Sequence, residues 1–581
     1  MINRIRLLSV LVATILTTAV IGQNSNDARP VTQTYFVKNA IVVQQPGTTL
    51  PSTSIVIKDG LITGMGSGIP APYDAKVIDA DSMYVYAAWI DAAGHAGLPK
   101  ADEGDRPKVK NPGKPPNDVA GITPQHKAAD LIKYDDKSIK EMREAGYGYA
   151  HVLPRGRMLP GVGAIITTGD GGREHMLLQD QTGMYSQLRS ARGVFPNTVI
   201  GVMSKYRDLY KNAQLAASYE STYSKRPTGL QRPSASKELA ALGPVVSNGM
   251  PVYFRAEKVR DILKVLTLQE ELGFDLVLTD ARQADKVLPQ LKSKNIPILL
   301  SLELPKEIKD KKDDEKKGKD KSDNSKNGGD NTEIAKSKKE AEKDTSDPLK
   351  AAFDKRKMEA YAAYESQAAE VAKAGVPFAF STISTKPKET AANIQRMMKR
   401  GLTADQALAA LTTTAAKLTG LSNVAGTVEK GKLGNLIICD KPYFDEKSKI
   451  KYMLVDGKVY EYEEKKKKKS DGSDTGDLSG TWSYVLEIPG QESAGTMVIE
   501  KDGDSYLVKL DSSEEPGDFE DAFDVDMDGS TLSFGLNVDD SGMTLNITSE
   551  MTFEGDEFTG TMSITQFGAF PVTGSKTSQP K

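Results

Sequence analysis

The residues with the clearest chemical potential stand at the ends of predicted strands. His95 follows the β-prone run 84–91 and is one of only four histidines in 581 residues, while Arg255 and Asp280 each end a later apolar run. Imidazole can act as a general base or a metal ligand, and a guanidinium can hold a carboxylate through two parallel hydrogen bonds. These three side chains are therefore the first candidates for a site.

The elements that would position them alternate between strand-like and helix-like patterns. A strand pattern over 251–254 precedes a helical pattern over 259–272, and the same order recurs at 275–278 and 284–292. Further strand patterns cover 296–300 and 376–380, and helical patterns cover 127–145, 393–400 and 404–419. This alternation predicts a (β/α)8 barrel, whose strand ends meet at one rim. His95, Arg255 and Asp280 should then lie close together.

Short β-like runs occupy both sides of this region. Residues 32–88 and 426–462 contain alternating strands divided by Gly and Pro, with a tight turn at Lys58-Asp59-Gly60. We predict that the two segments form one composite β-sandwich beside a barrel of residues 89–425.

The first strand end carries a family resemblance. Ile90-Asp91-Ala92-Ala93-Gly94-His95 resembles the amidohydrolase superfamily, in which a first barrel strand ends in Ile-Asp-x-His-x-His. The resemblance extends to the composite β-sandwich and to the last helical segment, residues 401–421. It implies hydrolysis of a non-peptide C–N bond, in a cyclic amide or an N-acyl substrate, by water that a bound metal ion activates.

The ligand positions that the resemblance implies are largely replaced. Ala93 stands where the first histidine of the pair belongs, Ile383 where the last strand carries an essential aspartate, and Arg255 where another strand ends in histidine. Asp280 falls near a further expected histidine, and the strand-four ligand has no clear counterpart. We therefore expect a degenerate metal site with no cofactor. Zinc is implied by the resemblance alone, with His95 as the one retained candidate ligand.

Two functions remain open. One is altered hydrolysis with His95 and Asp280 as catalytic groups, and the other is an exported pseudoenzyme that binds a ligand or pairs with an intact amidohydrolase paralogue. A small-molecule ligand would be held by Arg255 and by Arg155 and Arg157. These last two lie in the Gly/Pro loop 153–164, which resembles a loop of a secreted, imidazolonepropionase-like branch.

The other histidines and one acidic run have simpler explanations. His126 begins a helical pattern and fits a capping or surface role, His151 lies in an apolar strand and fits a hydrogen-bonded core residue, and His175 lies in a loop. Residues 524–529 mimic the start of a calcium loop, but strand patterns flank them and a hairpin turn explains them better.

Composition and the N-terminus indicate where the protein works. Arg4 and Arg6 precede an apolar run over 7–21, which is typical of a secretory signal peptide, here residues 1–22. We expect export to the periplasm or outside of a bacterium, and no later run is apolar enough to span a bilayer. The net charge of −3 gives no reason to expect nucleic acid, and the single Cys439 excludes an internal disulfide.

Two charged stretches interrupt the folded regions. Residues 306–347 are rich in Lys and Asp with few apolar side chains, which predicts a disordered insertion in a barrel loop. Residues 463–477 contain five consecutive lysines and predict a linker. Beyond it, residues 478–575 show short alternating strands with Asp-Gly turns, which predict an antiparallel lipocalin-like or small barrel domain.

Overall fold

The structure is a computed structural model that describes residues 33–99, 108–234, 236–305, 348–462, 478–488, 491–502, 505–512, 515–528, 530–540, 543–564 and 568–577. The chain divides into two compact units after Tyr462. The expected signal peptide, the insertion 306–347 and the linker 463–477 lie outside the described residues. None of the described helices has the length and hydropathy needed to cross a membrane.

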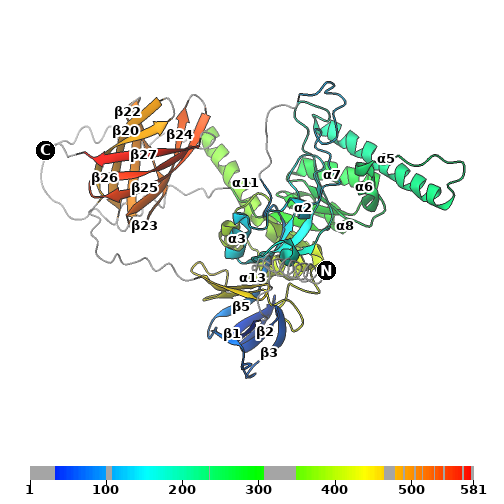
Figure 1. The fold of residues 1–581 in the computed structure, drawn as a ribbon, viewed down its shortest axis with the longest axis horizontal. Helices are drawn as coiled ribbons and strands as arrows, with labels where there is room; N and C mark the ends of the chain where they lie inside the picture. Colours follow the sequence, from blue (N-terminus) through cyan, green and yellow to red (C-terminus); the bar gives the residue numbers. More distant parts are fainter. Residues whose placement is uncertain are drawn as a thin grey trace, which may run out of the picture. The chain divides into compact units, whose positions relative to one another are not determined.

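The two ends of the first unit share one β-sheet, seen in Figure 1 as blue strands beside ochre ones. Its strands are β1 (Thr34–Gln45), β2 (Thr48–Lys58), β3 (Leu61–Gly66), β4 (Lys76–Asp79), β5 (Tyr84–Ala87), β16 (Leu436–Cys439), β17 (Ile450–Val455) and β18 (Lys458–Glu461). We expected a β-sandwich, but β5 pairs directly with β16 and makes one continuous sheet. Alternate side chains such as Ile55 and Ile438 are buried in its core.

The barrel is built from eight strand positions within the described chain. The strands are β6 (Trp89–Gly94), β7 (Tyr147–Val152), β8 (Gly161–Val162), β9 (Ala164–Thr167), β11 (Met184–Gln187), β12 (Val252–Arg255), β13 (Leu276–Ala281), β14 (Ile298–Ser301) and β15 (Phe378–Ser381). β6 runs parallel to β7, and β11 to β15 form a parallel series.

One barrel position departs from the predicted (β/α)8 pattern. β8 and β9, divided only by Gly163, lie between β7 and β11 and run antiparallel to both. The all-parallel prediction is wrong here. Antiparallel neighbours need no crossover helix, and the loop 153–160 returns the chain directly to its partner. A short strand β10 (Leu177–Gln179) then pairs with β9.

The helices of this unit are α2 (Ala128–Leu131), α3 (Lys137–Glu144), α4 (Arg173–Met176), α5 (Val199–Lys225), α6 (Lys237–Val246), α7 (Val259–Leu272), α8 (Leu288–Ser293), α11 (Pro348–Lys373), α12 (Thr390–Lys399), α13 (Ala404–Leu411) and α14 (Thr413–Thr419). The predicted helix 127–145 is two helices, α2 and α3. α7 follows its prediction: Ile262 and Val265 bury one face, and Gly273 ends it with a φ of 72° that suits glycine.

The second unit is an all-antiparallel sheet. Its strands are β19 (Gly480–Ile488), β20 (Gln491–Asp502), β21 (Ser505–Ser512), β22 (Glu515–Asp521), β23 (Phe523–Asp528), β24 (Thr531–Asp540), β25 (Met543–Glu554), β26 (Glu557–Ile564) and β27 (Gly568–Lys576). The sheet curls into a half-barrel around Trp482, Phe553 and Phe558, so the antiparallel prediction is confirmed but a closed barrel is not. Residues 524–528 of the calcium-like run lie in β23, which pairs antiparallel with β24, and residue 529 lies outside the described residues.

Candidate functional site

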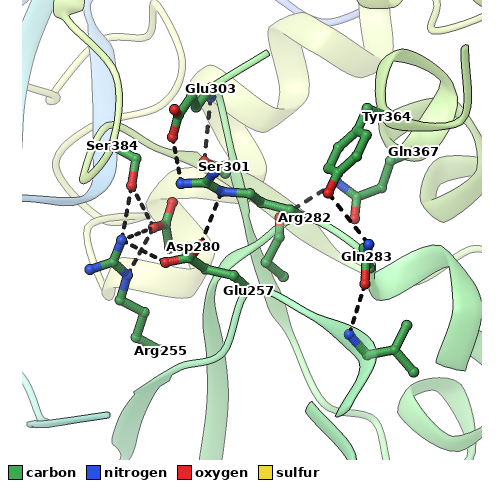
Figure 2. A network of polar contacts seen from close by, with 12 residues as sticks. Arg255, Glu257, Asp280, Arg282, Gln283, Ser301, Glu303, Tyr364, Gln367 and Ser384 are labelled. Atoms are coloured by element: carbon green, nitrogen blue, oxygen red, sulfur yellow. Dashed lines mark hydrogen bonds and ion pairs between the residues drawn. The ribbon is translucent and has the colours of Figure 1, made fainter. Parts of the chain in front are cut away.

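A charged network covers the carboxyl ends of several barrel strands (Figure 2). Arg255, the last residue of β12, directs its guanidinium at Asp280 near the end of β13. Its Nη2 lies 2.9 Å from Asp280 Oδ2 and its Nε donates to the same oxygen at 3.0 Å. Ser384, just beyond β15, also donates to Asp280 Oδ2 at 2.9 Å. The structure therefore brings two of the three predicted site residues into direct contact.

The network continues toward β14. Glu257 Oε1 lies 2.8 Å from Arg255 Nη2, and Glu257 Oε2 lies 3.5 Å from Arg282 Nε. Arg282 forms a further ion pair with Glu303, which follows the end of β14. Burial alone would lower the pKa of Arg255, but Tyr185, Asp280 and Glu257 outweigh it and raise that pKa. The Arg255 side chain is therefore a permanent cation at this rim.

Asp280 is in a strained and sheltered position. Its side chain is fully buried, and its backbone φ of 54° is unusual for a residue other than glycine. Oδ1 has no hydrogen-bond partner among the described residues. Such buried orphan groups are rare in folded proteins and cluster where a chain does more than pack.

His95 lies at the same rim and is uncharged. Its Nδ1 donates to the Leu153 carbonyl at 2.7 Å, which leaves Nε2 as the basic nitrogen. The ring meets Tyr185 edge to face, with centroids 6.1 Å apart. Burial lowers the pKa of His95 to about 3, with the charges of Arg155 and Arg255 adding to the effect. The imidazole is thus neutral throughout the physiological range.

A second buried carboxylate closes the barrel. Asp91 of β6 accepts hydrogen bonds from Thr382, at 3.2 Å from the backbone N–H and at 2.7 Å from Oγ1. The same Thr382 N–H lies 2.9 Å from the Ala93 carbonyl, so β15 is joined to β6 at this seam. Burial raises the pKa of Asp91 to about 7, against the lowering effect of these hydrogen bonds.

Comparisons with known proteins agree with this fold. Residues 335–461 match the amidohydrolase family. An amidohydrolase from Thermotoga maritima MSB8 is similar in structure, with a TM-score of 0.56 and 19% sequence identity, over 74% of this chain and all of that chain. This segment therefore resembles the amidohydrolase family, and the chain is similar in fold to that amidohydrolase. No curated protein matches the sequence.

Two further structures are less similar. A putative prolidase from Bifidobacterium longum has a TM-score of 0.42 and 13% identity, over 74% of this chain and 95% of that chain. A β-aspartyl dipeptidase from Fervidobacterium islandicum AW-1 has a TM-score of 0.41 and 11% identity, over 74% and 97%.

The residues at the barrel rim do not fit a zinc or manganese ion. Ala93 is a buried methyl, Ile383 packs against the core, and the Arg255 guanidinium takes up the Asp280 carboxylate while repelling a divalent cation. Within the described ranges, no three His, Cys, Asp or Glu side chains are grouped closely enough to hold a metal ion.

The two loop arginines are in different situations. Arg155 is exposed, and its charge acts on His95. Arg157 is half-buried and donates to the Ser190 carbonyl at 2.8 Å, so it supports the loop. Of the two loop arginines, Arg155 therefore has the charge that acts on His95 at the rim, whereas Arg157 has a structural role in the loop.

The remaining histidines lie in the core or on the surface, as the sequence predicts. His151 is fully buried inside β7, with Nδ1 donating to the Ala92 carbonyl at 2.8 Å and Nε2 accepting from Thr182 Oγ1 at 2.7 Å. Burial lowers its pKa to about 4. His126 and His175 are exposed.

Sequence reasoning missed Glu257, Arg282, Glu303, Ser384 and Tyr185. A signal was present for the first two. Two neighbouring strands end in runs whose charges are reversed: a cation then an anion in Arg255-Ala256-Glu257, and an anion then a cation in Asp280-Ala281-Arg282. When the two strands pair side by side, each cation therefore comes to lie near an anion of the other strand. Tyr185 and Ser384 carry no comparable signal, because only the closed barrel brings them to the rim.

Proposed function

We propose that this chain is an exported member of the superfamily that binds a small ligand at its barrel rim without a metal ion. The observation that carries the proposal is Arg255, a fixed cation bound to Asp280 where the family resemblance implies a metal ligand. Ala93 and Ile383 support it, because neither has a donor atom for a metal. The predicted signal peptide supports a periplasmic or extracellular site of action.

The ligand is a small carboxylate. Arg255 is already surrounded by Asp280, Glu257 and Ser384, which leaves exposed Arg155 as the guanidinium that a ligand can reach. Neutral His95 lies beside it as a hydrogen-bond acceptor. N-acetylalanine should raise the Tm of the wild type by a few degrees and that of Arg155→Ala by less than about 1 °C. Arg173→Ala, which removes an exposed partner of Asp130, should respond like the wild type.

Metal analysis tests the proposal directly. The purified protein, loaded with zinc or manganese and then desalted, should retain far less than one equivalent by elemental analysis. Stoichiometric metal in the wild type that is absent from His95→Ala would refute the metal-independent site.

A second candidate is altered hydrolysis of a non-peptide C–N bond, and one observation favours it. The His95 hydrogen bond to Leu153 leaves Nε2 unprotonated, as a general base must be. Turnover of N-acyl amino acids that persists in a chelator and falls at least 100-fold in His95→Gln would support it. Pairing with an intact amidohydrolase is the remaining alternative, and sedimentation as a lone monomer beside such a paralogue would count against it.

A further inference from the structure

We propose that the Arg255 guanidinium is a tethered cation that occupies an oxygen cradle and joins the barrel strands as a bound ion would. The proposal rests on the proposed function, because it explains how a barrel rim without metal ligands is held together. In this proposal Asp280, Glu257 and Ser384 act as the ligands of the Arg255 cation. Glu257 and Ser384 were not among the site residues predicted from the sequence.

The cradle is centred on one atom. Arg255 Nη2 lies 2.8 Å from Glu257 Oε1, 2.9 Å from Asp280 Oδ2 and 3.0 Å from Ser384 Oγ. Two carboxylate oxygens and one hydroxyl oxygen therefore surround a single positive nitrogen, as Figure 2 shows. Oxygen donors of this kind are the ones that bind hard cations in proteins. Arg255 Nε also donates to Asp280 Oδ2 at 3.0 Å, so Asp280 receives two nitrogens of the guanidinium while Glu257 and Ser384 complete the set around Nη2.

The three oxygens come from separate parts of the barrel. Asp280 is on β13, Glu257 follows β12, and Ser384 follows β15, which is separated from β13 by β14 in the sheet. Through Glu257, the contacts continue to Arg282 and then to Glu303 beyond β14. One guanidinium therefore links β15 to β12 and β13, which pair with each other but are separated from β15 in the sheet by β14.

Asp280 supplies independent evidence that the cradle needs its cation. The side chain is fully buried, Oδ1 has no partner among the described residues, and the backbone is left-handed at a φ of 54°. A carboxylate in this position persists only when its surroundings oppose both desolvation and strain. The wider network carries three carboxylates against two guanidiniums, so loss of Arg255 leaves an excess of negative charge around the buried Asp280.

Chemical rescue tests the proposal. Arg255→Ala should lower the Tm of the full chain by roughly 5 °C or more, and 10 mM guanidinium chloride should restore at least half of that loss while sodium chloride at equal ionic strength does not. The wild type should gain nothing from either salt. Arg255→Met should be as unstable as Arg255→Ala but insensitive to guanidinium, because its side chain fills the space.

Two further variants test the need for a cation even if Arg255→Ala does not fold. Arg255→Lys retains a tethered cation and should lose less than half as much Tm as Arg255→Met. Arg255→Gln is neutral but still donates hydrogen bonds, and it serves if Arg255→Ala does not fold. A wild-type Tm in Arg255→Gln, or no guanidinium effect on folded Arg255→Ala, would overturn the proposal. Metal binding by the wild type is a separate result that bears on the proposed function, not on this rescue.

Discussion

Two buried carboxylates at the barrel rim are stabilised in different ways. Asp280 of β13 is held by the guanidinium of Arg255 on β12. Asp91 of β6 instead receives hydrogen bonds from neutral groups of Thr382 and Ala93. Both side chains are fully buried. The difference shows that a barrel can join strands through a fixed charge pair or through a carboxyl that is free to take up a proton.

The largest effect should come from breaking the charge pair. Arg255→Met leaves Asp280 buried without its cation, and removal of one partner of a buried pair costs about 3–5 kcal/mol. Urea unfolding should show this loss in the free energy of unfolding. Arg173→Met, which removes an exposed partner of Asp130, should cost less than about 1 kcal/mol. Equal losses in the two variants would mean that the rim pair has no special role.

One added methyl group should disrupt the contact between β6 and β15 at Asp91. In Gly94→Ala the new Cβ would lie 2.0 Å from Asp91 Oδ2 and 2.8 Å from Thr382 Oγ1, so the carboxyl must leave its donors. We expect a loss of roughly 3 kcal/mol in the free energy of unfolding. Gly64→Ala is the matched control, because its Cβ meets nothing closer than 3.7 Å and should change stability by less than about 0.5 kcal/mol. A tolerated Gly94→Ala would show that the seam is loosely packed.

The pH dependence of stability separates the seam from the charge pair. Since the folded pKa of Asp91 is raised to about 7 from 3.8, the folded state holds a proton that the unfolded state has lost between these values. The Asp91 contribution to stability is therefore present at low pH and is lost as pH rises toward 7. Between pH 5 and pH 7.5 this loss should be on the order of 2 kcal/mol, and Asp91→Asn should abolish it.

The contribution of Asp91 is obtained at each pH as the free energy of unfolding of the wild type minus that of Asp91→Asn. Asp456, whose pKa is raised to about 6 by burial, has the same sign as Asp91. The lowered pKa values of His95 and His151 have the opposite sign, because the unfolded histidines take up protons below pH 6.5. Those contributions cancel in the difference between urea curves of wild type and Asp91→Asn. A difference independent of pH would exclude a raised pKa for Asp91.

Much of this site follows from sequence order, and the rest needs the closed barrel. Strand patterns ending in His95, Arg255 and Asp280 were sufficient to predict one rim, because parallel strands align their carboxyl ends. The antiparallel β8–β9 segment escaped prediction because short apolar runs do not reveal direction. The contact between Asp91 and Thr382 joins residues 291 positions apart, and only closure of β15 on β6 creates it.

The smallest effects should come from removing one hydroxyl at each carboxylate. Ser384→Ala removes a donor to Asp280 Oδ2, but Arg255 still donates to that oxygen, so we expect a loss of about 0.5 kcal/mol. Thr382→Val removes the donor that reaches Asp91 Oδ2 at 2.7 Å, and the described residues show no second donor to that oxygen. Its loss should be about 1.5 kcal/mol, larger above pH 7 than at pH 5 because the ionised carboxylate depends more on donors. Urea curves at both pH values provide the measurement. Equal losses in the two variants would mean that Arg255 does not substitute for a missing hydroxyl, and the distinction between the two regions would be lost.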